Sequence, residues 1–211
     1  MSRAAIIRRW RAFRACEDGT TLTELAVALA LFLLLLLGLL DFGRLAFHHV
    51  TAEKAMQIAA RVAAVRPAAC TGVPQIHVRG DAAPPARFGT SCGAGTGICA
   101  AAAEASCLGA ATNATAAEIW GLVGSGLPHG TTIANLRFRY ASDPNLGFLG
   151  GPYTPVVTVE LEDVTFQFVS PLGTLVGLTG ATPPNGLGGT IDFPAMSVSL
   201  PAEDLALGTN G

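Results

Sequence analysis

The sequence predicts an α+β protein in which one long N-terminal helix packs on a small antiparallel sheet. All 13 prolines follow residue 66, so residues 20–66 can form a single helix without interruption. Several later segments alternate apolar and polar residues with a period of two, which is typical of half-buried strands. Four cysteines lie between these parts in Pro/Gly-rich sequence, which indicates a loop region held by disulfides.

The first part of the predicted helix is apolar enough for a membrane span. Residues 25–40, LAVALALFLLLLLGLL, contain no polar side chain. At about 1.5 Å per residue, residues 20–40 would measure about 31 Å, close to the ~30 Å of a bilayer core. We therefore predict a transmembrane helix over 20–40 and its extracytoplasmic continuation over 41–66. In the continuation, a stripe of large apolar residues is expected to pack on the head: Phe47, Val50, Ile58, Val62 and Val65.

Charge is distributed unevenly about this span. Five arginines and no acid precede Glu17: Arg3, Arg8, Arg9, Arg11 and Arg14. Residues 67–211 carry four basic and ten acidic residues. A basic flank stays on the cytoplasmic side of a membrane, so residues 1–19 are predicted to be a cytoplasmic leader and residues 67–211 an exported head. The acidic head argues against a nucleic-acid partner, because phosphate contacts need clustered Lys or Arg.

The cysteines agree with this topology. Cys16 lies on the predicted cytoplasmic side, and four cysteines lie beyond the span, the even number expected where thiols are oxidised. These four, Cys70, Cys92, Cys99 and Cys107, allow three pairings, of which we favour Cys92–Cys99 nested inside Cys70–Cys107. A zinc site is the alternative, but the sequence has no CxxC pair and its histidines there are isolated, so no metal is expected.

The head is predicted to contain one short helix and several strands. Thr115 and Glu118 have the spacing of a capping box at a helix start. Strands are expected near residues 136–140, 157–161 and 196–200. After Asp163 the alternation continues in the opposite phase to residue 168, which indicates either a bulge or a break between two strands.

The junction before the span, Glu17-Asp-Gly19-Thr20-Thr-Leu-Thr-Glu24, resembles the type IV prepilin signal. That resemblance implies cleavage after Gly19 by a prepilin peptidase, which leaves Thr20 as the new N-terminus. A carboxylate in an apolar helix is costly, and we expect the free α-amino group of a neighbouring subunit to neutralise Glu24 and set the register between helices. The alternatives are an ordinary signal anchor with a chance Gly and Glu, and a signal peptide removed by type I signal peptidase.

The following residues look like the start of TadE-like proteins, which are minor pilins or pseudopilins of the tight-adherence (Flp-type, IVb) pilus system. The resemblance covers about residues 17–66 and includes Gly38-Leu-Leu-Asp41-Phe42-Gly43-Arg44. It departs from many members at Ala30, where they have proline, and Leu25 replaces the tyrosine of major Flp pilins.

This resemblance implies a type IV pilin-like fold and a bacterial inner-membrane protein that crosses the membrane once, with its head periplasmic or extracellular. It also implies a set of partners: a prepilin peptidase, other pilin or pseudopilin subunits, the pilus assembly platform of the inner membrane, and the lipid bilayer.

Rival functions rest on weaker patterns. Gly89-Thr-Ser91-Cys-Gly93 satisfies G-x-S-x-G, but a nucleophile elbow follows a strand, and two adjacent prolines precede this string. Gly93, Gly95 and Gly97 lack the third glycine and βαβ context of a dinucleotide site. We therefore expect neither catalytic residues nor a cofactor. The alternative to a pilus subunit is a signal-anchored extracytoplasmic binding module, such as an adhesin or envelope sensor, without pilin processing.

Overall fold

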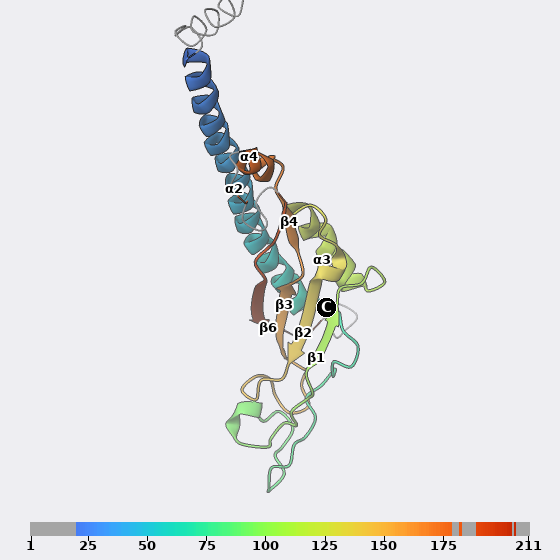
Figure 1. Ribbon diagram of the computed structural model, residues 1–211. Helices are drawn as coiled ribbons and strands as arrows, with labels where there is room; N and C mark the ends of the chain where they lie inside the picture. Colours follow the sequence, from blue (N-terminus) through green and yellow to red (C-terminus); the bar gives the residue numbers. More distant parts are fainter. Residues whose placement is uncertain (1–19, 179–181, 183–188, 204, 206–211) are drawn as a thin grey trace, which may run out of the picture. The chain divides into compact units, whose positions relative to one another are not determined.

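A computed structural model describes residues 20–178, 182, 189–203 and 205 (Figure 1). The predicted leader, with Cys16 and Gly19, lies outside the described residues. The chain forms two compact units. The first combines residues 1–44 with 168–189, and the second combines 45–167 with 190–211.

One helix, α2, runs from Thr20 to Val65 and contributes to both units. It contains no proline, which explains its unbroken length. Its end lies one residue before the predicted one. Arg66 N still donates to Val62 O at 3.1 Å, and Pro67 cannot continue the series because it has no N–H.

The second unit contains a four-stranded antiparallel sheet in the order β1-β2-β3-β6. The strands are β1 (Ala105–Leu108), β2 (Leu136–Ala141), β3 (Val156–Leu161) and β6 (Met196–Pro201). In the register, Phe138 lies opposite Val159, and Val159 lies opposite Val198. Alternate residues of β2 and β3 are buried, as the period-two pattern predicts. The α+β, type IV pilin-like fold predicted from the sequence is confirmed.

The helix face that is buried in the second unit differs from the predicted one. Phe47 is 66% exposed and Ile58 is 47% exposed, so the prediction that their stripe packs on the head is wrong. The buried side chains on this part of α2 are all small except one: Ala52, Ala55, Met56, Ala59, Ala60, Ala63 and Ala64. Small side chains allow a helix to approach a sheet closely, whereas a phenylalanine or isoleucine in the same place would hold it off.

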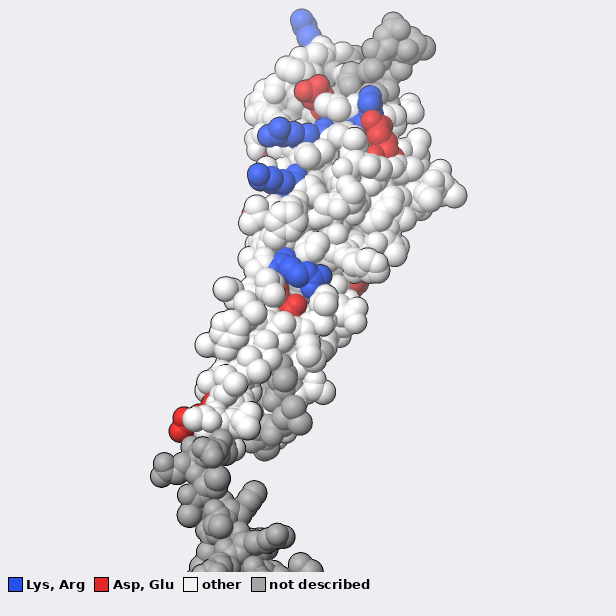
Figure 2. All heavy atoms as spheres, turned by 90° about the horizontal axis from the view of Figure 1, so that it is seen from above, with Lys and Arg blue, Asp and Glu red and all other residues white. Residues whose placement is uncertain are grey.

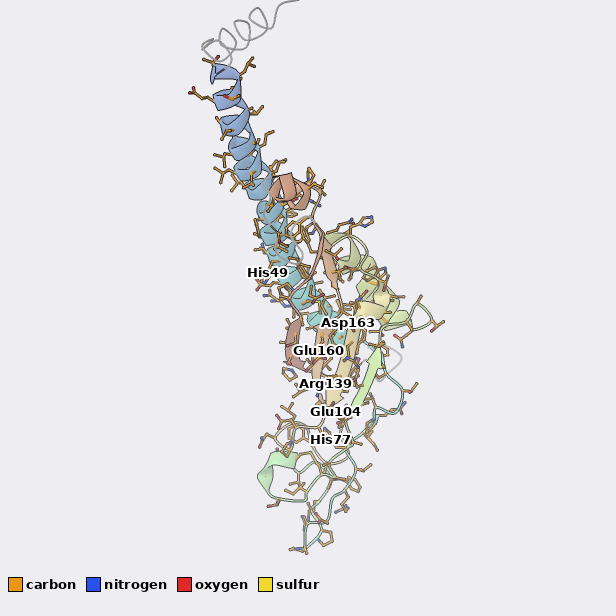
Figure 3. The ribbon with its side chains drawn as sticks, in the orientation of Figure 1. His49, His77, Glu104, Arg139, Glu160 and Asp163 are labelled. Carbon is orange, nitrogen blue, oxygen red and sulfur yellow. A yellow bond between two sulfur atoms is a disulfide. The ribbon has the colours of Figure 1, made fainter. Side chains whose placement is uncertain are left out.

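The opposite face of the sheet carries a row of ion pairs. Arg139 lies between Glu160 and Glu104, with N–O distances of 3.2 and 2.9 Å (Figure 3). Arg137 pairs with Glu162 at 2.7 Å. Half-exposed pairs of this kind contribute about 0–1 kcal/mol each, so they mark the solvated face rather than hold the sheet together. In the space-filling view of Figure 2, Lys, Arg, Asp and Glu together cover a small part of the surface.

The short helix α3 (Ala114–Val123) begins earlier than predicted. Asn113 is its N-cap, because Asn113 Oδ1 accepts a hydrogen bond from Ala116 N at 2.9 Å. The predicted cap at Thr115 is wrong. The Thr115 hydroxyl instead donates to Pro67 O at 2.7 Å and ties α3 to the end of α2.

The reversal of phase after Asp163 is a break between strands. Asp163 has φ 55°, and beyond it β4 (Thr165–Gln167) leaves the main sheet to pair with β5 (Thr190–Asp192). β1, β5 and the seven-residue helix α4 (Leu172–Leu178) were not predicted. Single 3₁₀ turns occupy Cys92–Ala94, Gly124–Gly126 and Ile133–Asn135.

Candidate assembly interface

The N-terminal part of α2 has an apolar surface on every side. Most side chains of residues 21–40 are exposed, and Leu25, Leu35 and Leu39 are each more than half exposed. Within the described residues, α2 is the one helix whose length and composition suit a membrane span. Lipid solvates such a surface, whereas water does not, so this helix fits a single-pass membrane protein.

Glu24 lies on this apolar surface. Its side chain is exposed, and so are those of Leu22 and Leu25 beside it. An exposed carboxylate is unremarkable in water, but within lipid it needs a cation or hydrogen-bond donors. Thr20 is the first residue of α2, and Gly19 lies outside the described residues. Cleavage at Gly19 and the role of Glu24 in register therefore stay predictions.

The second half of α2 carries an exposed stripe, here called the outer stripe, opposite its buried alanine face. The stripe has four exposed apolar members, Phe47, Val50, Ile58 and Val65, and two exposed basic members, Lys54 and Arg61. All six follow one another at helical spacing. A helix that served only as a stalk would be expected to expose polar residues here. Large apolar side chains along one exposed helix face are typical of a protein-protein contact.

Asp41 occupies a built site in the first unit. Its side chain is 2% exposed, although it follows the apolar run directly. Asp41 Oδ1 accepts a hydrogen bond from Val169 N at 3.2 Å, and Oδ2 accepts one from Ser170 N at 3.1 Å and another from the Ser170 hydroxyl. Arg44 Nη1 lies 3.5 Å from Oδ1. The carboxylate therefore fixes a chain segment that is remote in sequence to the helix.

The two disulfides have the nested arrangement favoured from the sequence. Cys70 pairs with Cys107 and Cys92 with Cys99, with Cα–Cα distances of 5.5 and 5.2 Å. His77 lies beside the inner pair, and its ring nitrogen and the two sulfur atoms are all within 4.8 Å of one another. Both sulfurs are committed to a covalent bond, so they are not thiolate ligands for a metal in this form.

Burial lowers the pKa of His77 from its ordinary value of 6.5. His77 Nε2 accepts a hydrogen bond from Thr154 N at 3.1 Å, which requires the neutral ring with its proton on Nδ1. Gly147 has φ 80°, and a Cβ there would overlap the His77 ring. These contacts describe a histidine that helps to order the loops rather than one that is free to exchange protons.

Ser91 of the G-x-S-x-G string lies in irregular structure. It forms an isolated bridge with Phe148 and directly precedes the 3₁₀ turn Cys92–Ala94. The strand before and the helix after the serine, which a nucleophile elbow needs, are not formed in this part of the described chain.

Comparison with protein families gives a match that lies almost entirely within α2. A family described as TadE-like protein matches residues 19–61. Residues 19–61 are therefore similar to TadE-like proteins. The match begins at Gly19, contains Glu24 and Asp41, and ends at Arg61 within the outer stripe. No curated protein and no solved structure matches the chain.

The TadE-like segment thus holds the apolar span and most of the outer stripe, while the sheet lies outside it. The sequence placed Asp41 only within the TadE-like pattern of residues 38–44 and did not predict its hydrogen bonds to Val169 and Ser170. No local pattern connects Asp41 with residues 128 and 129 positions further along the chain. Such a pairing depends on the tertiary fold.

Proposed function

We propose that this chain is a minor-pilin-like structural subunit for assembly of a tight-adherence (type IVb) pilus, without catalytic chemistry of its own. In this proposal, a prepilin peptidase removes residues 1–19 at the cytoplasmic face of the bacterial inner membrane. Residues 20–40 then anchor the subunit in the bilayer with its head outside. Other pilin or pseudopilin subunits and the inner-membrane assembly platform are its partners, together with the lipid bilayer. The TadE-like match supports the pilus system.

The outer stripe carries the proposal. On the second half of α2 the alanines are used for packing within the subunit, and the large apolar residues are left exposed. A neighbouring helix would bury Phe47, Ile58 and Val65 together, since successive members lie eleven and seven positions apart and share one face. At about 25 cal/mol per Å² of apolar area, burial of three such side chains would contribute several kcal/mol to a subunit contact.

The positive charges in the outer stripe restrict its partner. Lys54 and Arg61 flank Ile58 on the same exposed face. Like charges placed opposite each other are destabilising, so two outer stripes would not pair in direct register. A staggered neighbour, or a different subunit with acidic residues on its helix, would fit better. Glu24 supports the same requirement for a partner chain, because its exposed carboxylate needs neutralisation within the span.

The test compares two substitutions that spare the fold of the subunit. Ile58→Glu places a charge on the outer stripe, and Glu24→Leu removes the charge from the span. We expect both variants to remain in the inner-membrane fraction. Their incorporation into cross-linked or pilus-associated complexes should be at least tenfold lower than that of the wild type. Incorporation is measured by co-purification with the other subunits after membrane extraction.

Gln57→Glu is the matched control, since it adds the same charge at an exposed polar position beside the outer stripe and leaves the apolar members of the stripe in place. Intact mass of the extracted wild-type protein reports on processing. Normal incorporation of both variants, together with retention of residues 1–19, would contradict the proposal and favour the signal-anchored binding module.

A further inference from the structure

A segment without charged residues belongs to the same compact unit as the membrane span. The longest stretch of the sequence without Asp, Glu, Lys or Arg runs from Val164 to Ile191. Residues 168–189 of this stretch cluster with residues 1–44. Because none of these residues carries a charge, the segment can contact lipid without placing a charged side chain there.

The position of this segment along α2 is fixed by Asp41. Val169 N and Ser170 N both donate to its carboxylate, which places them beside the residue that directly follows the predicted span. The ring of Phe168 also lies against that of Phe42, with centroids 5.7 Å apart. Residues 168–170 are therefore held at the level at which the helix leaves the predicted bilayer.

The side chains at this level are apolar and uncovered. Val169 is 75% exposed, and on the helix Leu39, Leu40 and Phe42 are each more than half exposed. Asp41 itself is buried, and its oxygens accept three hydrogen bonds. The Asp41 carboxylate and the backbone N–H groups of Val169 and Ser170 thus satisfy one another. The exposed side chains beside them are apolar except for Arg44, whose side chain is 45% exposed and, at the end of the span, can reach the headgroup level.

Helix α4 follows directly in the chain. Its sequence, LGTLVGL, has one polar side chain, and the Thr174 hydroxyl donates to Pro171 O at 2.7 Å. Seven residues extend over about 10 Å, which is too short to cross a bilayer. A helix of this length is marginal in water, where about 12–15 residues are needed for stability in isolation. Figure 1 shows α4 beside the apolar part of α2.

We propose that residues 169–178 form a second membrane-contacting element, in which α4 lies in the bilayer interface and Asp41 holds it to the helix where the span ends. This inference rests on the membrane span of the proposed function. Its consequence is a subunit attached to lipid at two places, so that rotation of α2 about its axis is restricted before assembly. Asp41 acts as a positioning residue, since it orients the loop without entering the lipid contact.

The experiment uses three variants of the full-length chain, each with a single tryptophan at a different position. In all three, Trp10 and Trp120 are replaced by phenylalanine. Val169→Trp reports on the proposed element. Phe88→Trp is the matched aqueous control, because Phe88 is 73% exposed in the loop region. Leu31→Trp reports on the span itself. The variants are reconstituted at high lipid-to-protein ratio in phosphatidylethanolamine and phosphatidylglycerol vesicles whose acyl chains carry bromine, a contact quencher of tryptophan fluorescence.

We expect Leu31→Trp and Val169→Trp to be quenched at least threefold more strongly than Phe88→Trp. Adding Asp41→Ala should remove most of the quenching at position 169 and leave that at position 31 unchanged. Quenching at 169 no stronger than at 88, while position 31 is quenched, would overturn the inference and leave the span intact. Absence of quenching at position 31 would overturn the span as well. A blue shift at 169 that depends on protein concentration and not on bromine would identify contact with a second copy and would also overturn it.

Discussion

The helix-packed sheet and the loop region of residues 68–104 belong to one compact unit but contain very different amounts of regular structure. The sheet buries large side chains completely, among them Phe138, Tyr140 and Leu161. The loop region contains isolated bridges and one 3₁₀ turn, and its buried apolar residues are few. Two disulfides lie in it or join it to the sheet.

This difference separates two sources of stability within one head. In the sheet, burial of apolar area outweighs the entropy lost on ordering the chain. In the loop region burial is insufficient, and covalent closure reduces the entropy of the unfolded chain instead. The sheet should therefore respond most to changes in side-chain volume, and the loop region to changes in redox state and pH.

Loss of the outer disulfide is expected to have the largest effect. Cys70→Ser with Cys107→Ser opens a loop with a sequence separation of 37, and the loop-entropy relation gives a loss of about 4 kcal/mol in the free energy of unfolding. The matched pair Cys92→Ser with Cys99→Ser opens a separation of 7 and should lose about 2.5 kcal/mol. Denaturant unfolding of the detergent-solubilised chain, followed by near-UV circular dichroism, measures both. Equal losses would show that loop closure does not govern this region.

The second largest loss of stability is expected from a change in side-chain volume at the contact between α2 and the sheet. Ala59 is fully buried on the alanine face of α2, and Ala59→Leu adds volume where the helix approaches the sheet. We expect a loss of about 1–3 kcal/mol in the free energy of unfolding from overpacking. Gln57→Leu adds a leucine at a neighbouring exposed position and should change stability by less than about 0.5 kcal/mol. Similar effects at the two positions would contradict the assignment of faces.

The alanine face also shows where sequence reasoning stops. The absence of proline predicts the length of α2, and period two predicts β2, β3 and β6, because these depend on local chemistry. The choice of buried face does not depend on local chemistry alone, since α2 has one stripe of large apolar residues and another of alanines. The structure buries the alanine stripe, and this choice depends on contacts with residues far away in the sequence. β5 and α4 are short, and the three residues of β5 are too few for a period to be recognised.

For the candidate interface, the sequence alone supplied the span, the position of Glu24 and the nested disulfides. It grouped the four apolar members of the outer stripe with Val62 but expected that group to pack on the head, whereas these four members are exposed. The hydrogen bonds of Asp41 could not be predicted, because they join residues 128 and 129 positions apart. Local patterns therefore describe the helix well and its long-range contacts poorly.

The smallest predicted effect is a pH dependence of the loop region that the sheet does not share. Burial lowers the pKa of His77 in the folded chain below its ordinary 6.5. As pH falls below about 6.5, the unfolded chain binds a proton that the folded chain does not, so stability is full above this pH and declines below it. Protonation would also place an N–H donor against Thr154 N, which now donates to Nε2.

The slope from this single group is at most about 1.4 kcal/mol per pH unit, between about pH 6.5 and 5, above the range in which most carboxylates titrate. Unfolding midpoints measured at intervals across this range provide the test, with His77→Gln as the control that has an uncharged side chain at every pH. The slope should be lower in His77→Gln than in the wild type. An unchanged slope would assign the pH dependence to other groups and show that His77 does not distinguish the loop region from the sheet.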